Sequence, residues 1–410
     1  MVFFLSVAGL SGSLLAFYQE INARLNPEIY HIQIPADKAP LDSFALRKRA
    51  EVLVPDGQIN WIPLHRLDGE SFIARFQPRM DMAGGTSHTH EIPRILALNP
   101  YTGDEIVRIQ EGWWPLTRQN LMDFIYALHW SLALGEPGQW LLGIAAAIWT
   151  MDCFVGFYLT LPIRRKVITS GQIKVRPKQL GFWQRWSLAW KVKWWSSAHR
   201  VNFDLHRAGG LWTWVMLFIF AWSSVAFNLG EQVYMPVMKF CCGMPDPVKN
   251  LPVLTQPKPK PGLAWQTAYS IGQQHMADQT QARGVAIQHE SLMYYDEVHG
   301  IFYYNVHSDL DVGESLGSTS VIFDGDSGML LAFIAPTGQN GALTFTNWIT
   351  NLHMAKVFGF AMQVFVCLMG LVVTILSVTG VYLWLKKRRS ERLRQKPRKP
   401  SMLATIGKNC

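Results

Sequence analysis

Histidine is the residue type in this sequence best suited to chemistry, because four histidines stand beside long apolar segments. His129, His206 and His353 each come shortly before such a segment, and His199 lies seven residues before His206. A histidine inside or beside a membrane-spanning segment is costly to desolvate and usually faces the protein interior. Neutral imidazole is also a common metal ligand. These four side chains are therefore the first candidates for a functional site.

Two of the histidines occupy equivalent places in a repeated segment. Residues 94–108 and 320–333 each predict a β-hairpin, with apolar residues alternating on both sides of a Gly-containing turn. His129 follows the turn residue Gly103 by 26 positions, and His353 follows Gly328 by 25. Each histidine is preceded by leucine and followed six residues later by glycine. This agreement predicts a duplicated unit made of a small outer α+β domain and the helix after it.

A matched pair of histidines on duplicated helices is what a bis-imidazole haem site requires. A haem iron in an electron carrier takes axial ligands on both faces, so the ligands must come from two elements that sandwich the ring. Small residues such as Gly135 and Gly359 would relieve crowding between the helices. For a single histidine the competing interpretation, a helix cap or a hydrogen bond to a backbone carbonyl, is preferred. For the pair His129 and His353 we favour haem ligation.

His206 has no evident partner. His199 would lie on the same face of a continuous helix, roughly 10 Å away, and two rings on one face cannot sandwich a haem. A partner from the cytoplasmic start of the first apolar segment is geometrically better, but the chain starts too late to show one. Haem ligation and a structural role therefore both stay open for His206.

The apolar segments make the chain an integral membrane protein. Hydrophobic residues form 49% of the chain and charged residues 16%, which is less charge than the quarter typical of soluble proteins. Four stretches exceed the roughly 18 residues that indicate a span, and they lie at 2–18, 138–162, 209–229 and 358–385. The first lacks the basic start and the small-residue cleavage site of a signal peptide, so a retained helix is favoured.

The net charge of +9 is divided unevenly along the chain, and the division predicts the orientation. Residues 163–200 hold ten Lys/Arg and no acid, and residues 386–410 hold ten Lys/Arg and one Glu, so these segments carry +19 and the remainder −10. Short basic loops stay cytoplasmic. Both termini are therefore predicted to be cytoplasmic, with His129 and His353 near the outer surface and His206 near the inner one. Because the positive charge is concentrated in these two predicted cytoplasmic segments, it does not indicate a nucleic-acid partner.

The predicted fold class is an α-helical integral membrane protein, a four-helix transmembrane bundle with two outer α+β domains. The expected segments are 1–19 (first helix, truncated at its start), 20–117 (first outer domain), 118–162 (helical entry and second helix), 163–200 (basic cytoplasmic loop), 201–229 (third helix), 230–345 (Pro-rich linker and second outer domain), 346–385 (fourth helix) and 386–410 (basic cytoplasmic tail).

Two other groups are weaker candidates. His88 and His90 stand two residues apart in a Gly-containing loop, but a metal site usually needs three or four ligands. The five cysteines form no Cys-x-x-Cys pattern, which argues against a zinc knuckle, an iron–sulfur cluster and a covalently attached haem. We assign no role to the adjacent Cys241 and Cys242.

Three histidine motifs in this order, together with the hairpins, resemble the PepSY-associated transmembrane helix family over nearly the whole chain. The motifs are Leu-His-Trp-Ser-Leu-Ala-Leu-Gly (128–135), Asn-Phe-Asp-Leu-His-Arg-Ala-Gly-Gly-Leu-Trp (202–212) and Leu-His-Met-Ala-Lys-Val-Phe-Gly (352–359). The hairpins at 94–108 and 320–333 look like the family's periplasmic PepSY-like domains. Family members are bacterial inner-membrane proteins associated with iron acquisition. The best understood of them are ferric siderophore reductases that carry two b-type haems.

The resemblance implies that His129 and His353 are axial ligands of an outer haem b, and that His206 is a ligand of an inner one. The family has a further histidine near the start of its first helix, and nothing here matches it. Residues 12–27 instead resemble the later part of that helix. The resemblance therefore implies that Met1 is an internal methionine and that the inner haem depends on an upstream ligand.

Transmembrane electron transfer to a ferric siderophore or another ferric chelate in the periplasm is the leading hypothesis. The electron donor would be a quinol or a cytoplasmic reductase. No catalytic side chain is predicted, because outer-sphere transfer to iron needs none. The alternatives are a non-catalytic, membrane-anchored module whose PepSY-like domains bind a protein or peptide, and a haem relay that passes electrons to another partner.

Overall fold

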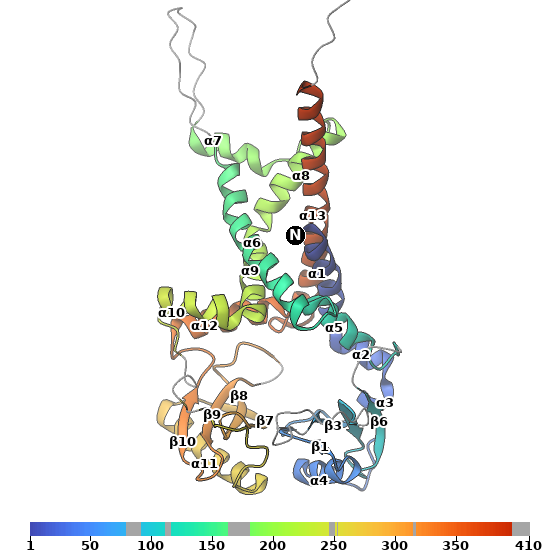
Figure 1. Ribbon diagram of the computed structural model, residues 1–410, viewed down its shortest axis with the longest axis vertical. Coiled ribbons are helices and arrows are strands. Elements are labelled where there is room, and N and C mark those ends of the chain that lie inside the picture. Colours follow the sequence, from blue (N-terminus) through green and yellow to red (C-terminus); the bar gives the residue numbers. More distant parts are fainter. Residues whose placement is uncertain are drawn as a thin grey trace, which may run out of the picture.

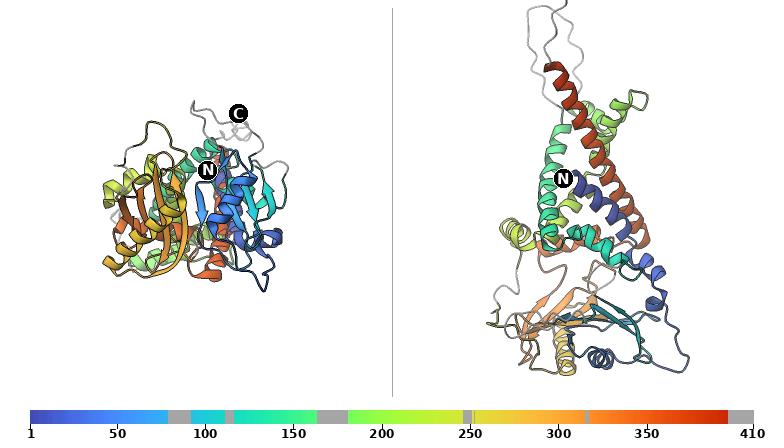
Figure 2. Two further views of the ribbon diagram at one scale, coloured as in Figure 1. Left: turned by 90° about the horizontal axis from the view of Figure 1, so that it is seen from below. Right: turned by 45° about the vertical axis from the view of Figure 1, so that its right-hand side comes forward.

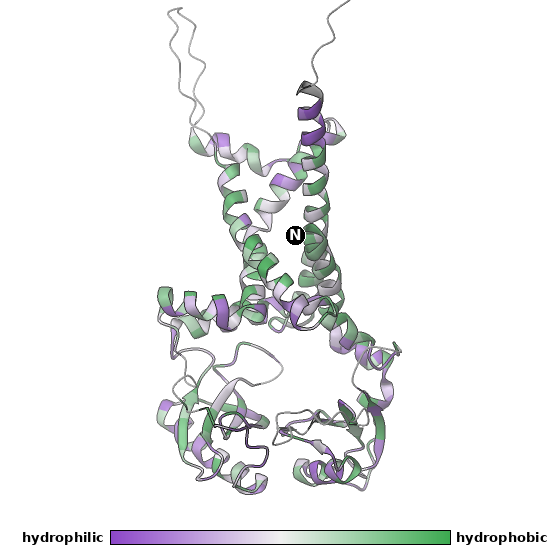
Figure 3. Cartoon of the chain, in the orientation of Figure 1, coloured by the Kyte–Doolittle hydropathy of each residue, from purple (hydrophilic) through white to green (hydrophobic). Residues whose placement is uncertain are grey.

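Helices form one end of the protein and β-sheets the other, as the computed structural model shows (Figure 1). The structure describes residues 1–78, 92–110, 116–162, 181–245, 251, 253–314 and 317–395. His88 and His90, part of the basic loop at 163–200 and the end of the basic tail lie outside the described residues. Figure 3 shows hydrophobic residues along much of the helical end and hydrophilic ones at the far tip of its longest helix.

Two helices of the described chain are each long and apolar enough to cross a membrane. They are α6 (Glu136–Thr160) and α13 (Gly359–Gln395). Two bent pairs pass the same test when each is taken as one span: α1 (Val2–Leu15) with α2 (Tyr18–Leu25), and α8 (Ala198–Trp212) with α9 (Trp214–Asn228). These elements overlap all four predicted apolar stretches.

The third span departs from the single helix predicted at 209–229. The chain bends by 70° between α8 and α9. The hydroxyl of Thr213, the residue between them, donates to the carbonyl oxygen of Gly209 at 2.8 Å. Such back-bonding bends helices, and glycines at 209 and 210 lower the local helix propensity. His206 therefore stands on α8, which has a different direction from the apolar α9.

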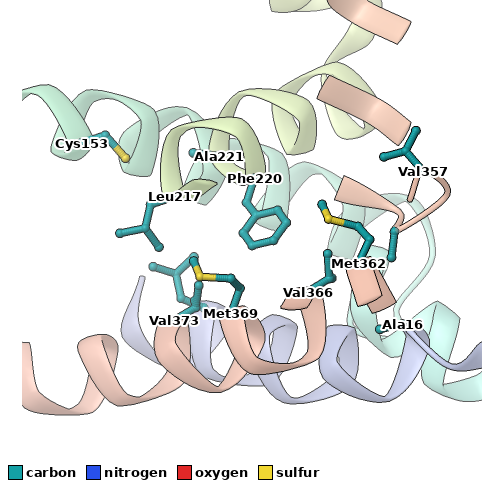
Figure 4. Packing of buried hydrophobic residues seen from close by; sticks show 12 residues of the cluster. Ala16, Cys153, Leu217, Phe220, Ala221, Val357, Met362, Val366, Met369 and Val373 are labelled. Atoms are coloured by element: carbon teal, nitrogen blue, oxygen red, sulfur yellow. The ribbon is translucent and has the colours of Figure 1, made fainter. Parts of the chain in front are cut away.

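Two close helix pairs build the helical end. α1 packs along α13, and α6 packs along α9 (Figures 1 and 2). Small residues permit the first contact, because a Cβ added to Gly9 would lie 2.6 Å from the carbonyl oxygen of Gly370. Ser13 also donates to the carbonyl oxygen of Cys367 at 2.8 Å. Side chains of α9 and α13, including Phe220, fill the core between the pairs (Figure 4).

Two sheets at the other end contain the predicted hairpins. β5 (Ile95–Leu98) and β6 (Glu105–Ile109) are antiparallel and form a three-stranded sheet with β3 (Phe72–Arg75). β9 (Thr319–Asp324) and β10 (Leu330–Ile334) are also antiparallel. They continue a larger sheet with β8 (Ile301–Ser308) and β7 (Ile287–Asp296). Both hairpin predictions are confirmed.

One helix covers each sheet, which explains the two apolar cores at this end. α4 (Ser43–Leu53) buries Phe44 and Leu46 against the first sheet. α11 (Trp265–Arg283) buries Met276 against the second, where Phe302 and Phe323 lie. Each sheet therefore presents one face to a helix, as expected of an α+β domain.

The two outer segments share a sheet, which the predicted boundary between 20–117 and 230–345 does not foresee. β2 (Trp61–Pro63) comes from the first segment but pairs with β7, so the larger sheet has the order β10-β9-β8-β7-β2. Periodicity alone cannot assign a three-residue strand to a distant partner. The two domains therefore form a continuous structure rather than separate modules.

The remaining elements connect these parts. They are α3 (Pro27–Tyr30), β1 (Gly57–Gln58), β4 (Gln77–Pro78), α5 (Leu121–Ser131), α7 (Phe182–Trp186), the 3₁₀ helix η1 (Ser187–Trp190), the π-helix η2 (Gly230–Tyr234), α10 (Met235–Cys242) and α12 (Gly341–His353). α5, α10 and α12 lie between the helical end and the sheets (Figure 1).

Candidate functional site

Two short helices at the base of the helical end carry the matched histidines. His129 is in the last turn of α5, and His353 is the last residue of α12. Each helix is followed by a reversal with residues at positive φ, at 132, 133 and 135 after α5 and at 355, 358 and 359 after α12. The duplicated segments therefore share a local structure of helix, histidine, left-handed reversal and long apolar helix.

Gly135 and Gly359 serve this reversal, which differs from the expectation that they relieve crowding between helices. Their φ angles are +65° and +56°, a region that glycine enters without steric cost. A Cβ added to Gly135 would meet nothing within 4 Å, and one added to Gly359 would meet only a Glu314 oxygen at 3.8 Å. Backbone conformation, rather than close helix approach, requires glycine here.

The fold brings the imidazoles of His129 and His353 together. Their ring centroids are 6.1 Å apart, and the ring planes meet at 82°. His353 also lies edge-on to Phe220 and Phe227, with centroid distances of 5.1 and 5.5 Å. His353 is thus flanked by two aromatic side chains from α9.

The hydrogen bonds of His353 define which of its nitrogens carries the proton. Ser223 lies 2.6 Å from Nδ1 of His353, and the same hydroxyl is 2.6 Å from the carbonyl oxygen of Ile219. A hydroxyl has one hydrogen, and the carbonyl can only accept, so Ser223 accepts from Nδ1–H of His353. The lone pair of a neutral His353 is then on Nε2.

His129 has the same tautomer for a similar reason. Its Nδ1 lies 3.0 Å from the carbonyl oxygen of Ala8, which can only accept. Ser11 is 3.1 Å from the same nitrogen and donates its own hydrogen to the carbonyl oxygen of Val7 at 2.7 Å. In the part of the chain that the structure describes, no hydrogen bond uses Nε2 of His129 or of His353. Both rings therefore have an uncommitted Nε2 lone pair.

His206 occupies the opposite end of the helical part and has an equivalent arrangement. Its Nδ1 is 3.0 Å from the hydroxyl of Thr379, which donates to the carbonyl oxygen of Ile375 at 2.8 Å. Thr379 is therefore the acceptor, and Nε2 of His206 again carries the lone pair. His199 is exposed in the first turn of the same helix. The structure does not bring His199 and His206 together.

Glycines make room beside both candidate sites. A Cβ added to Gly12 would lie 2.9 Å from Cε1 of His129, and one added to Gly380 would lie 3.2 Å from Cε1 of His206. Contacts this short force a neighbouring side chain to shift, so a larger residue at Gly12 would displace the His129 ring. The sequence motifs centred on the histidines did not identify Gly12, Ser223 or Thr379, because all three are distant from their partner in the chain.

These donor sets suit a haem iron. Within the described residues no group of three or more His, Cys, Asp or Glu side chains could hold a metal ion, so a metal held by protein ligands alone has no site there. A haem needs only two protein ligands, with Nδ1–H anchored and Nε2 free. His129 and His353 each offer such a nitrogen, and their ring centroids are 6.1 Å apart.

A hollow of about 360 Å³ lies beside the reversal that follows His353. It is lined by Trp348 of α12, by Val357 and Phe358 of the reversal, and by the β8–β9 connection, including Asp311 and Glu314. Trp348 and Phe358 are 40% and 67% exposed, so this wall of the hollow is aromatic and accessible. Burial lowers the pKa of the nearby Lys356 ammonium.

An ion-pair network connects α5 to the first sheet. Asp123 of α5 pairs with Arg94, which precedes β5, and accepts a hydrogen bond of 2.8 Å from Tyr18 of α2. Asp123 is partly buried, where such charge-assisted bonds are strong. The helix that carries His129 is thus tied to the first outer domain.

A family model described as the PepSY-associated TM region matches residues 1–387. The chain belongs to this family. Membership in the PepSY-associated TM family makes it a membrane protein with PepSY domains, in agreement with its apolar helices and its β-sheets. No curated protein matches the chain.

Proposed function

We propose that this protein is a transmembrane electron carrier that holds b-type haem and reduces a ferric siderophore or another ferric chelate in the periplasm. His129 and His353 would be the two axial ligands of the outer haem, and His206 would be one ligand of an inner haem. The supporting observation is that the imidazoles of His129 and His353 lie with their ring centroids 6.1 Å apart, each with an anchored Nδ1–H and an uncommitted Nε2.

Haem supplies a one-electron iron couple when it is bound. The protein's side chains supply the ligands, the potential and the exclusion of water. With both His129 and His353 as ligands, a bound haem would have no position left for oxygen, which suits an electron carrier. Histidine sites near both ends of the helical part divide the roughly 30 Å of the hydrocarbon core into shorter hops. One electron from a quinol or a cytoplasmic reductase converts Fe³⁺ of the chelate to Fe²⁺, which oxygen ligands hold more weakly.

The ferric complex would approach at the hollow beside Trp348 and Phe358. This hollow adjoins the reversal after His353, so it brings a docked complex towards the outer histidine pair. Its carboxylates favour a complex of neutral or positive charge. On this proposal, Phe358→Ala raises the KM for the ferric complex severalfold while the haem content stays unchanged.

Absorbance spectroscopy of the purified full-length protein, produced with an ample haem supply, tests the proposal. We expect a Soret band, and we expect His129→Ala and His353→Ala each to remove the same outer haem. His31→Ala is the matched control, because His31 is exposed and far along the chain from both sites. Absence of a Soret band in the wild type would falsify the proposal, and loss of different haems in the two variants would refute the pairing.

One observation favours a second candidate function, a binding module anchored in the membrane. A cavity of about 460 Å³ lies between the two outer domains, lined by Arg47 and Asn60 of the first and by Trp265 and Tyr295 of the second. Arg47 stacks on the Trp265 ring at 4.4 Å. This candidate requires no haem, so the same absorbance measurement separates the two functions.

A further inference from the structure

A row of three stacked imidazoles crosses the sheet that the two outer domains share. His65 follows β2 of the first domain, and His289 and His307 are register partners on β7 and β8 of the second. The ring centroids of His65 and His289 are 4.3 Å apart with an interplanar angle of 25°. Those of His289 and His307 are 5.0 Å apart at 23°. No part of the proposed electron transfer uses these residues.

The row runs from the surface into the interior. His65 is exposed, His289 is half-buried and His307 is 8% exposed. Nε2 of His307 donates to the carbonyl oxygen of Gly313 at 2.8 Å, and its buried Nδ1 has no hydrogen-bond partner among the described residues. A proton added to Nδ1 would create a second buried N–H that has no acceptor, which is costly.

Charged groups surround the row, but none of the described ones forms an ion pair with it. They are Glu70 near His65, Arg66 next to it in the chain, Glu290 on β7, and Asp309, Asp311 and Glu314 in the β8–β9 connection. Glu290 accepts from Tyr269, Gln273 and Tyr304. Asp309 accepts from the backbone N–H of Ala286, Asp311 from that of Ser308, and Glu314 from that of Gly359. These last four carboxylates therefore already accept hydrogen bonds from groups outside the row.

The stacked geometry suits a proton switch better than a metal site. No three ligand groups of the described residues converge on one point, and rings that lie nearly parallel direct their nitrogens sideways. Protonation instead creates like charges 4.3–5.0 Å apart. Burial, and secondly the neighbouring His289, lower the pKa of His65.

We propose that the His65–His289–His307 row is a pH-sensitive clasp that joins the two outer domains when its rings are neutral and releases them in acid. The row lies at the end of the β2–β7 pairing, where the N–H groups of Leu64 and His65 donate to the carbonyl oxygen of Ser291 at 3.0 and 3.3 Å. Repulsion between imidazolium rings acts directly on this end of the strand pairing and separates β2 from β7.

The direction of the pH effect follows from the lowered pKa of His65. In the open state His65 titrates near the ordinary value of about 6.5. In the clasped state its pKa is lowered by burial and by the neighbouring His289 ring, which lies 4.3 Å away. The open state therefore binds the proton of His65 more readily, and the clasp weakens as the pH falls below about 6.5. Above that value His65 is neutral in both states, and the clasp has its full strength.

Hydrogen–deuterium exchange of the full-length protein, read by mass spectrometry and corrected for the intrinsic pH dependence of exchange, tests the clasp. Between about pH 7.5 and 5.5 we expect the amides of 61–65 and 289–295 to exchange faster in the wild type, by roughly tenfold for each unit of pKa difference between the two states. His289→Gln removes the central charge and should abolish most of this acceleration. His299→Gln is the control, because His299 pairs with Asp296 outside the row.

A second variant guards against a folding defect in His289→Gln. His65→Lys places a permanent charge on the exposed end of the row, so it should open the same amides already at pH 7.5. The clasp is refuted if the wild type shows no acid response, if His289→Gln responds like His299→Gln, or if His65→Lys stays closed.

Discussion

A hydroxyl or carbonyl oxygen determines which nitrogen carries the proton in each candidate haem ligand. The Nδ1–H group of His353 donates to Ser223, and that of His206 donates to Thr379. The Nδ1–H group of His129 is shared between Ser11 and the carbonyl oxygen of Ala8. Without such acceptors, a neutral imidazole could place its lone pair on either nitrogen. These hydrogen-bond acceptors therefore orient the proposed iron ligands and tune their basicity.

Ser223→Ala should weaken haem binding more than Ser11→Ala does. Ser223 is fully buried, and its removal leaves Nδ1–H of His353 without an acceptor, whereas His129 keeps the carbonyl of Ala8. Loss of such a partner typically costs 10–100-fold in metal affinity, so we expect about that factor for Ser223→Ala. Haem transfer to excess apomyoglobin measures the affinity, and equal losses in the two variants would contradict the assignment.

At the scale of elements, His129 and His353 each depend on a reversal between a short helix and a long one. The turn between α5 and α6 is compact, because a Cβ added to Gly138 would lie 1.7 Å from the carbonyl oxygen of Ser131. The α5 helix ends at Ser131, two residues after His129. Any widening of this turn moves the end of α5, and with it the His129 ring.

Gly138→Ala should therefore lower the haem content and the stability of the protein. Forced overpacking typically costs about 1–3 kcal/mol in free energy of unfolding, and here it acts next to a proposed ligand. Gly156→Ala, also in α6, is the matched control, because its Cβ would meet nothing within 4 Å. The Soret absorbance per protein and the thermal midpoint report the two effects. Normal haem content in Gly138→Ala would disprove the link between the turn and the site.

The β9–β10 turn makes a pH-dependent contribution of its own. Asp324 accepts from the N–H groups of Asp326 and Ser327 and from the Ser327 hydroxyl, and the bonds to Ser327 hold the pKa of Asp324 below its ordinary value. Stability from this carboxylate is present above the unfolded pKa of about 3.9 and is lost as the pH falls through the lowered folded value.

Asp324→Asn should therefore lower the thermal midpoint at pH 7 but have a smaller effect near pH 3. The neutral amide cannot provide the charge-assisted bonds that the wild type has at neutral pH. Asp278→Asn is the control, because Asp278 is exposed on α11. A deficit of the same size at both pH values would show that the charge of Asp324 plays no part.

At the scale of the whole molecule, the protein is polarised between a sheet end and a basic end. The sheets, α10 and α12 lie at one end, and α7, η1 and the last turns of α13 lie at the other (Figure 1). Short basic segments favour the cytoplasmic side, so in the proposed orientation the pair His129 and His353 would lie beside the periplasm. The proposed direction of electron transfer depends on this orientation.

Cysteine labelling with a membrane-impermeant maleimide tests the orientation. Cys241 and Cys242 are exposed at the end of α10, so we expect both to react in intact spheroplasts. Ser187→Cys on η1, in a background that lacks Cys241, Cys242 and Cys410, should react only after permeabilisation. The buried Cys153 is an internal control, expected to stay unlabelled. Labelling of Ser187→Cys in intact spheroplasts would reverse the assigned topology.

Local patterns in the sequence were sufficient to predict the apolar spans, the two hairpins and the duplicated histidine motif. Each depends on residues close in the chain: hydrophobic length for α6 and α13, alternation around Gly103 and Gly328 for the hairpins, and a repeated spacing for His129 and His353. The prediction that Gly135 relieves crowding between helices was wrong. A repeated spacing does not distinguish a glycine needed for its positive φ from one needed for a close helix contact.

The sequence by itself determined that this is a membrane protein of the PepSY-associated TM family, with His129, His206 and His353 shortly before apolar segments. Only the tertiary structure decided the 6.1 Å separation of the His129 and His353 rings, the bend at Thr213, the β2 strand shared between the domains and the histidine row across it. Apart from the bend, these features join residues more than two hundred positions apart, and neither hydropathy nor periodicity carries information about such partners.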